Sequence, residues 1–255
     1  TRCSRDWSSD VCSSDLTEVS LLLAEWLNGE IVSVDSMQVY RGLDIGTAKP
    51  SLEEQTRVRH HLIDVASLTE HFDAARFVEL ARVAVADIQA RGRVPILSGG
   101  TGLYFKAYFE GLGEAPASQP ELRAELEQTP LPELLRELAL RDPATYERID
   151  RQNPRRVVRA VEVLRLTGKP FSTLRAAWRQ PQAGDQPAVP SLLIGLSRER
   201  EDLCHRIALR VEEQFRQGVV AETEVAMANG LAGNRTAMQS IVYRQVVEYL
   251  QGQRP

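Results

Sequence analysis

Cysteine is scarce in this 255-residue sequence, whose three cysteines are Cys3, Cys12 and Cys204. Their spacing matches neither a metal-binding cluster nor a disulfide framework. His60 and His61 are adjacent, but no third ligand lies nearby in the sequence, so we expect them to be structural. Long apolar runs are missing, and the N-terminus lacks the apolar core of a signal peptide. We therefore expect no membrane span and a cytoplasmic location.

A strong excess of positive charge is absent too. The formal net charge is −4 and the isoelectric point is near 5.7, which argues against a protein that coats nucleic acid with a uniformly basic surface. Any phosphate binding must therefore come from local patches. The length suffices for one large or two small domains with a sizeable core.

The most informative stretch runs from Gly29 to Pro50. Its apolar start, residues 30–34, predicts a buried strand that stops at Asp35. Ligands collect at the carboxyl ends of strands in open α/β sheets, so Asp35 could accept a proton from a bound substrate. The alternative is that Asp35 or Ser36 caps a following helical turn. The long polar loop that follows favours a functional role, because donor-rich loops often carry function.

Alternating strand and helix patterns predict a parallel α/β core. The expected helices cover residues 17–28 (ended by Gly29), 74–91 (closed by Gly92) and 198–217, and the expected strands cover residues 60–64, 94–98 and 191–195. The segment after residue 98, Gly99-Gly-Thr-Gly102, joins a strand to a helix. Glycines there let backbone N–H groups approach a phosphate or a base, although a plain tight turn is the alternative. Thr101 is thus a candidate ligand contact at the same sheet edge as Asp35.

The pattern changes at about Gly113, where strand signals stop and short proline-separated helical segments begin. We interpret residues 113–187 as a helical insertion in the core. Within it, residues 151–179 carry eight basic side chains against the single acid Glu162. The arginines at 155, 156 and 159 fall on one helical face. A solvated surface is the ordinary explanation, but charge of one sign in an acidic protein favours binding of a phosphate backbone.

Four segments, in order along the chain, carry a resemblance to the tRNA dimethylallyltransferases (tRNA isopentenyltransferases). They are SVDSMQVYRGLDIGTAKP at 33–50, LSGGTGLYFKA at 97–107, PRRVVRAVEVLRLTGK at 154–169 and AMQSIVYRQ at 237–245. The resemblance spans residues 17–255 and implies a P-loop NTPase-like parallel core with an inserted, tRNA-binding helical domain. It also implies transfer of a dimethylallyl group from dimethylallyl diphosphate to the exocyclic amine of the adenosine 3′-adjacent to the anticodon. The expected partners are Mg²⁺ and the tRNA anticodon stem-loop, and we expect a monomer.

The same resemblance implies roles for individual residues. Asp35 would be the general base, with Thr101 and Arg210 completing the catalytic set. Thr17 would ligate the Mg²⁺ ion and, with Arg210, bind the diphosphate. The implied tRNA contacts are Asp35, Ser36, Met37, Gln38, Thr101, Arg123, Arg155, Arg156, Val157, Val158, Arg159, Gln239, Ser240, Ile241, Val242, Tyr243 and Arg244.

One feature of that family is missing from the sequence. A phosphate-binding loop reads G-x-x-x-x-G-K-[ST] just before such a helix, but Leu16 holds the lysine position and no glycine precedes Gly29. Residues 1–16 are polar and nearly repeat themselves. We interpret them as a non-native segment, of the kind that an assembly or cloning artefact produces, and we expect the family's last helices to be absent.

Two other functions stay open on the sequence. One is a nucleotide or small-molecule kinase on the same core, including an adenylate prenyltransferase, although a free nucleotide does not need a basic helical insertion. The other is an RNA-binding remnant that has lost catalysis with its phosphate loop. A kinase would turn over ATP without RNA, whereas a remnant would bind RNA and do no chemistry.

Overall fold

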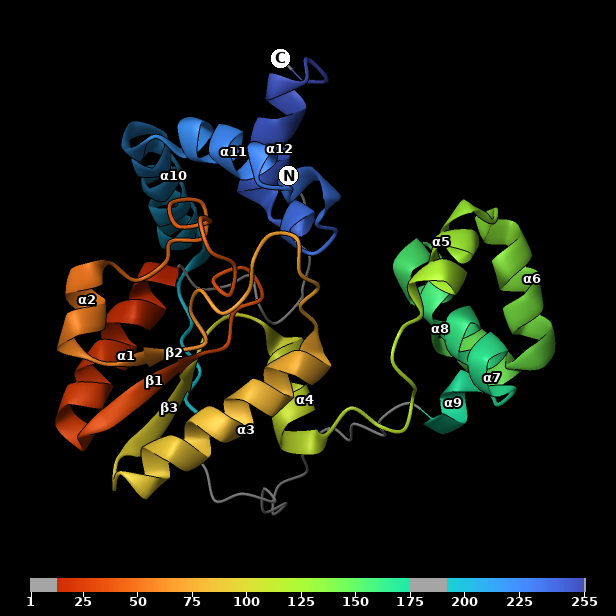
Figure 1. Cartoon of the computed structure of the whole chain (residues 1–255), viewed down its shortest axis with the longest axis horizontal. Helices are drawn as coiled ribbons and strands as arrows, with labels where there is room; N and C mark the ends of the chain where they lie inside the picture. The colour runs from red at the N-terminus through yellow and green to blue at the C-terminus, as the bar shows by residue number, and fades with distance from the viewer. Residues whose placement is uncertain (1–12, 175–191, 255) are drawn as a thin grey trace. The chain divides into compact units, whose positions relative to one another are not determined.

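A computed structural model describes residues 13–174 and 192–254. The chain divides into two compact units, one of residues 1–108 with 189–255 and the other of residues 109–188 (Figure 1). The insertion expected over residues 113–187 lies inside the second unit. None of the described helices is long and apolar enough to cross a membrane.

A three-stranded parallel sheet forms the centre of the first unit, in the order β2-β1-β3. The strands are β1 (Gly29–Ser33), β2 (His60–His61) and β3 (Val94–Ser98). Ile31 of β1 pairs with His60 on one side and Ile96 on the other. Every residue of β1 is buried, as expected of a central parallel strand. The predicted parallel α/β class is therefore confirmed, and the first strand begins one residue earlier than expected.

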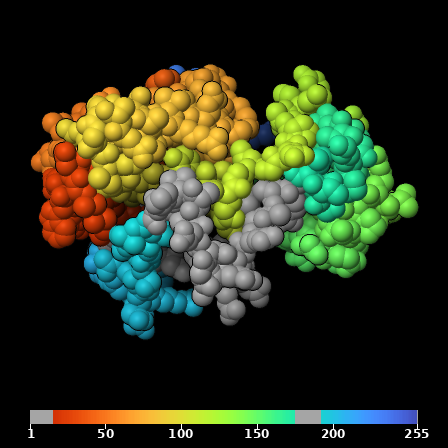
Figure 2. All heavy atoms as spheres, turned by 90° about the horizontal axis from the view of Figure 1, so that it is seen from below, coloured from red at the N-terminus to blue at the C-terminus, as the bar shows by residue number. Residues whose placement is uncertain are grey.

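Helices cover both faces of this sheet. Ile31 packs against Leu21 and Ala24 of α1 (Ser13–Leu27). Val32 points the other way, into a cluster with Phe77 of α3 (Ala74–Ala90), because side chains alternate along a strand. The outer side of α3 lies on the surface of this unit (Figure 2). Two shorter helices, α2 (Leu52–Arg57) and α4 (Gly102–Glu110), complete this part of the unit.

Glu30 is the buried acid of β1, and it joins the strand to its neighbours. Its Oε2 atom lies 2.7 Å from Nε2 of His61 on β2 and accepts a 2.7 Å hydrogen bond from Nη2 of Arg91, just after α3. Hydrogen bonding to Arg91, together with His61, holds the pKa of Glu30 at about 2 against the opposing effect of burial. Nδ1 of His60 contacts the Val58 carbonyl oxygen at 2.8 Å. One ring nitrogen of each histidine is thus engaged within the protein, an arrangement that agrees with the structural role expected of them.

Three local predictions are wrong. Helix α1 begins at Ser13 rather than Thr17, and Asn28 at φ 51° takes the left-handed position expected of Gly29. Gly29 belongs to β1, where a Cβ atom would lie 2.7 Å from the Val94 carbonyl oxygen. The strand expected over residues 60–64 stops after His61 because Leu62 turns to φ 63°.

The strand expected over residues 191–195 does not form in the described part, residues 192–195. Leu192 and Leu193 are 86% and 79% exposed. An apolar run becomes a strand only where a neighbouring strand can pair with its backbone N–H and C=O groups. None of the described strands β1 to β3 pairs with this segment. Residue 191 lies outside the described residues.

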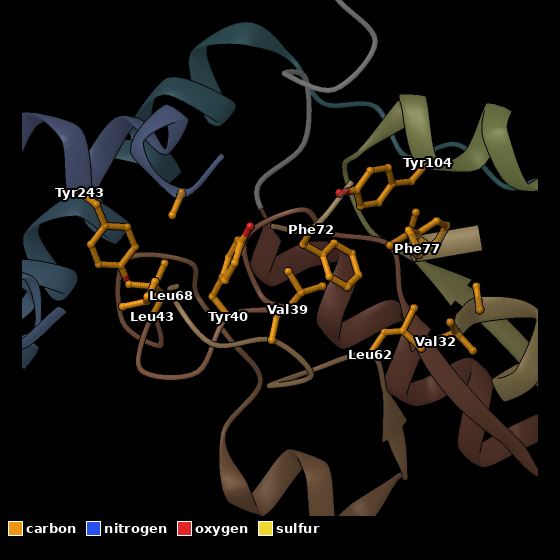
Figure 3. Close-up of a cluster of buried hydrophobic side chains, with 14 of the residues drawn as sticks. Val32, Val39, Tyr40, Leu43, Leu62, Leu68, Phe72, Phe77, Tyr104 and Tyr243 are labelled. Atoms are coloured by element: carbon orange, nitrogen blue, oxygen red, sulfur yellow. The ribbon is translucent and has the colours of Figure 1, made fainter. Parts of the chain in front are cut away.

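The last helices of the first unit pack on the loop that follows β1. They are α10 (Arg200–Gln217), α11 (Val219–Ala228) and α12 (Ile241–Leu250), with the 3₁₀ turns η1 (Leu231–Gly233) and η2 (Ala237–Gln239). Val219 of α11 and Tyr243 of α12 belong to one buried cluster with Val39, Tyr40 and Leu43 (Figure 3). The chain's end and the segment after β1 thus form a single core.

The second unit is helical. Its helices are α5 (Pro120–Gln128), α6 (Leu131–Arg141), α7 (Pro143–Arg148), α8 (Pro154–Thr167) and α9 (Phe171–Leu174). Leu126, Leu134, Leu138 and Val161 form its own apolar core, with α8 in contact with both α5 and α6.

Candidate active site

Strand β1 leads to Asp35 at the carboxyl edge of the sheet. Oδ1 of Asp35 accepts hydrogen bonds from the backbone N–H groups of Met37 at 2.7 Å and Gln38 at 3.2 Å. No described residue donates a hydrogen bond to Oδ2. Burial raises the pKa of Asp35, and the two backbone hydrogen bonds oppose that rise. Asp35 therefore anchors its own turn with Oδ1, and this arrangement leaves Oδ2 able to accept a proton.

Strand β3 brings Thr101 to the same turn. Oγ1 of Thr101 accepts a hydrogen bond from the Ser36 backbone N–H at 3.1 Å, and the Thr101 N–H donates to the Val34 carbonyl oxygen at 3.1 Å. Gly99 makes this approach possible, because a Cβ atom there would lie 2.2 Å from the same carbonyl oxygen. The glycine-rich turn thus brings two strand ends together, and it places Asp35, Ser36 and Thr101 at one edge, where the sequence predicted them.

The Gln38 side chain points into the protein rather than toward an RNA surface. Its Oε1 atom accepts a hydrogen bond from Ser33 Oγ at 2.9 Å, and its Nε2 atom donates to the carbonyl oxygens of Ala48 at 3.2 Å and Thr47 at 3.4 Å. Met37, the neighbouring candidate, is half-buried. Gln38 therefore joins the Asp35 turn to the loop of residues 42–49.

The segment predicted to contact tRNA near the end of the chain divides into two kinds of residue. Gln239, Ile241 and Arg244 are exposed, and Ile241 is 64% exposed. Tyr243 is buried, and its hydroxyl group donates to Oε1 of Glu222 at 2.5 Å. Burial first, and then the neighbouring carboxylate, raise the pKa of Tyr243. The remaining candidates, Ser240 and Val242, are half-buried. Tyr243 acts in packing, whereas the exposed residues can meet a partner.

Thr17 lies one helical turn after the first residue of α1. Because α1 ends at Leu27 and β1 begins at Gly29, the helix runs antiparallel to the strand, and its first turns lie toward the carboxyl edge. Helical residues 13–16 occupy the positions where a phosphate-binding loop would have to be. The other predicted diphosphate contact, Arg210, is half-buried on α10. In the described ranges, no three histidine, cysteine or acidic side chains gather as a metal site.

The basic stripe of α8 is not uniform. Arg155 and Arg156 are exposed, but Arg159 turns back to the buried carboxylate of Glu162, with 2.7 Å between Nη1 and Oε2. Glu162 also accepts hydrogen bonds from Ser118 and Gln119, and Arg123 reaches it at 3.4 Å. Arg155 and Arg156 are therefore the members of the predicted set that stand on the surface, while Arg123 and Arg159 are held by an acid.

Val157 and Val158, which the resemblance placed among the tRNA contacts, lie in the core of the helical unit. They are 0% and 3% exposed and pack in one cluster with Leu126, Leu134 and Leu138. Their side chains do not reach the surface. A motif match cannot distinguish these packing residues from their exposed neighbours, but the apolar period of α8 can.

The fold and site define a parallel α/β protein whose candidate site lies at the carboxyl ends of its strands, with a helical insertion. A family model described as IPP transferase matches residues 38–254. tRNA dimethylallyltransferase 1 of Citrifermentans bemidjiense is 42% identical over 240 residues, which cover 94% of this chain and 77% of that protein. The tRNA dimethylallyltransferase of Salinispora arenicola is 45% identical over 238 residues, or 92% of this chain and 68% of that protein.

Solved structures agree with this. The full-length tRNA isopentenylpyrophosphate transferase from Bacillus halodurans is 36% identical and superposes with a TM-score of 0.63, over 96% of this chain and 76% of that one. A eukaryotic dimethylallyltransferase acting on tRNA has the same fold, with a TM-score of 0.67 at 22% identity over 96% of this chain and 62% of that one. The chain belongs to the IPP transferase family.

Proposed function

We propose that this protein is a tRNA dimethylallyltransferase. It moves a dimethylallyl group from dimethylallyl diphosphate to the exocyclic amine of the adenosine 3′-adjacent to the anticodon. The observation that carries the proposal is the Asp35 turn in a chain of the IPP transferase family: a carboxylate of raised pKa with one anchored oxygen, beside Thr101 at the carboxyl edge of the sheet. Curated relatives at 42% and 45% identity carry the name of this activity.

The residues suit that reaction. An adenine amine is a poor nucleophile, so it needs a base to take its proton while the new C–N bond forms. In our proposal Oδ2 of Asp35 accepts that proton, Thr101 orients the base, and the C–O bond to the diphosphate breaks with its electron pair leaving on oxygen. Arg210 would assist by holding the negative charge of the leaving group.

A magnesium ion would neutralise the charge that develops on the diphosphate. The described residues offer no preformed cluster of acids for it. In our proposal the hydroxyl of Thr17 would be a protein ligand of an ion that arrives with the diphosphate.

We propose that the tRNA is held by exposed residues of each unit. Arg155 and Arg156 are the exposed cations of the predicted set on α8. In the first unit, Gln239, Ile241 and Arg244 are the exposed members of the predicted segment. A single adenosine in a structured loop must be splayed out to be modified, which requires contacts to its flanking backbone. We further propose a cytoplasmic monomer.

The sequence before Gly29 favours a second candidate. Without glycine or lysine there, no loop can wrap backbone N–H groups around a diphosphate. The chain as printed would then be an RNA-binding protein that transfers little or nothing.

Single-turnover transfer from labelled dimethylallyl diphosphate with Mg²⁺ to an anticodon stem-loop RNA tests the proposal. The matched control RNA carries inosine at the target position, because inosine lacks the exocyclic amine. Label on the adenosine RNA alone supports transferase activity. RNA binding without label supports the second candidate, and ATP turnover without RNA would show a kinase instead.

A further inference from the structure

The loop of residues 42–49 is held by side chains that lie far along the chain. The carboxylate of Glu222, on α11, accepts hydrogen bonds from three consecutive backbone N–H groups: Asp44 at 3.1 Å, Ile45 at 2.9 Å and Gly46 at 3.3 Å. Successive N–H groups that converge on one point form a nest for an anion. Here the anion is part of the protein.

Two further helices hold the same loop. Tyr243 of α12 donates its hydroxyl proton to Glu222 and accepts a hydrogen bond from the Gly46 N–H at 3.0 Å. Gln214 of α10 donates to the Ile45 carbonyl oxygen at 3.0 Å. Gly46 is required by this packing, because a Cβ atom there would lie 2.5 Å from the Tyr243 ring. Helices α10, α11 and α12 thus each fix the loop with a polar side chain.

The other side of the loop is fixed to the candidate active site. Nε2 of Gln38 donates to the carbonyl oxygens of Thr47 and Ala48, while its own backbone N–H binds Oδ1 of Asp35. A continuous path of hydrogen bonds and covalent bonds therefore runs from Glu222 through the loop to Gln38 and Asp35. Its covalent parts are the backbone between residues 44 and 48 and the side chain of Gln38.

We propose that Glu222 is a positioning residue for the Asp35 turn: through its nest of backbone N–H groups it fixes the loop of residues 42–49, and the loop fixes Gln38 and the Asp35 carboxylate. This proposal rests on the proposed function only where it takes Asp35 to be the catalytic base. It makes the geometry of the site depend on helices that follow it by more than 160 residues.

Amide hydrogen exchange of the full chain, without RNA or donor, tests the connection. The test variant is Glu222→Gln, which keeps the size of the side chain but turns an amide N–H₂ group toward the nest. The control is Glu224→Gln, an exposed position on the same helix. We expect roughly tenfold or faster exchange at Asp44, Ile45 and Gly46 in E222Q, because the loss of about 1.5–3 kcal/mol typical of a charged hydrogen bond corresponds to that factor or more.

The decisive amides are those of Met37 and Gln38, which do not contact Glu222. We expect their exchange to accelerate in E222Q and to stay unchanged in E224Q. Acceleration confined to residues 44–46 would overturn the proposal, and so would no acceleration anywhere. Exchange within β1 and α3 reports whether the unit is still folded.

A second variant and a second readout keep the test independent of folding defects. Tyr243→Phe leaves the carboxylate in place and removes one hydroxyl group, so we expect the same pattern at smaller amplitude. Carboxyl-detected NMR titration should show the Asp35 pKa moving down toward its ordinary value in E222Q, because a released turn is better hydrated. An Asp35 midpoint equal to that of the parent would count against positioning. Failure of the transferase assay would leave these results unaffected.

Discussion

At the scale of single residues, the two oxygens of the Asp35 carboxylate have different surroundings. Oδ1 is committed to the backbone N–H groups of Met37 and Gln38. That arrangement orients Oδ2 without using it, which is what a general base requires. The capping and catalytic interpretations of Asp35 are therefore compatible, although the sequence presents them as alternatives.

We expect Asp35→Asn to slow prenyl transfer by about 10²–10⁴-fold, the usual contribution of a positioned base. The turn should persist, because the Asn oxygen can still accept both backbone hydrogen bonds. Single-turnover transfer to an anticodon stem-loop, in a version of the chain given a phosphate-binding loop, measures the effect. Asp73→Asn is the matched control, since Asp73 caps α3 through Ala75 and Arg76 in the same way. A D35N rate within about threefold of the parent would remove Asp35 from the mechanism.

Glu30 gives a prediction about acid stability. Its pKa in the folded protein is about 2, below the ordinary value of 4.5, chiefly because of Arg91 and His61. A lowered pKa means that the ionised form stabilises the fold, so this stabilisation is complete above pH 4.5 and is lost as the pH falls toward 2.

We therefore expect the free energy of unfolding of the parent, measured with urea, to fall as the pH is lowered from about 5 to 2. Glu30→Gln should lack the part of that fall that Glu30 causes. E30Q should also be less stable than the parent at neutral pH, because the Arg91 guanidinium loses its partner. Exposed Glu110 supplies the control substitution, E110Q. Parallel curves of unfolding free energy against pH for the parent and E30Q would contradict the lowered pKa of Glu30.

At the scale of elements, α8 shows how one helix separates packing from binding. Its apolar face is buried in the helical unit, and Glu162 holds Arg159 and Arg123 close to that core. Only some of its arginines are therefore free to meet phosphates.

We expect the double change Arg155→Ala and Arg156→Ala to weaken tRNA binding and to lower the log–log salt slope by about 0.7–0.9 for each phosphate that is no longer neutralised. Arg159→Ala should leave the slope nearly unchanged and reduce the stability of the helical unit, because Glu162 is buried and loses a cation. Binding isotherms at several salt concentrations separate the two effects. A slope that is unchanged in the double variant would mean that the stripe is a solvated surface.

The elements that the sequence predicted best are those whose ends are set by neighbouring residues in the sequence. Asp73 caps the start of α3, and Gly92 follows its end in a left-handed turn at φ 68°. The predicted bounds of this helix differ from the structure by one residue. Residues 192–195, the described part of another predicted strand, do not form one, because a short apolar run does not show whether a pairing partner exists. The contact between Glu222 and the loop of residues 42–49 could not be predicted, because nothing local marks a carboxylate that binds N–H groups 176 to 178 positions away.

At the scale of the whole molecule, the proposed diphosphate binding requires a loop directly before Thr17, where residues 13–16 are already helical. Helix α1 starts at Ser13, and a continuous helix has no free N–H groups along its side for a diphosphate to bind. The contacts of the Asp35 turn, with Met37, Gln38 and Thr101, are all made among the described residues.

We expect the chain as printed to bind dimethylallyl diphosphate feebly with or without Mg²⁺. Replacing residues 1–16 by an apolar strand and a glycine-rich loop ending in Gly-Lys before Thr17 should restore binding. Isothermal titration calorimetry with both proteins measures the difference, and the same graft with its lysine changed to alanine is the control. Tight, Mg²⁺-dependent binding by the printed chain would contradict this expectation.

The sequence has three lysines, and one of them, Lys49, has a buried side chain. Lys106 and Lys169 are exposed, whereas the Lys49 side chain is 4% exposed, with Nζ bonded to the Tyr40 carbonyl oxygen and to Asp44 and Asp64. An amine-acylating reagent should therefore modify Lys106 and Lys169 first. The fraction of Lys49 that becomes acylated, measured by peptide mass spectrometry, would report how often the loop of residues 42–49 opens. Lys49 can therefore serve as a natural chemical probe for the opening of that loop.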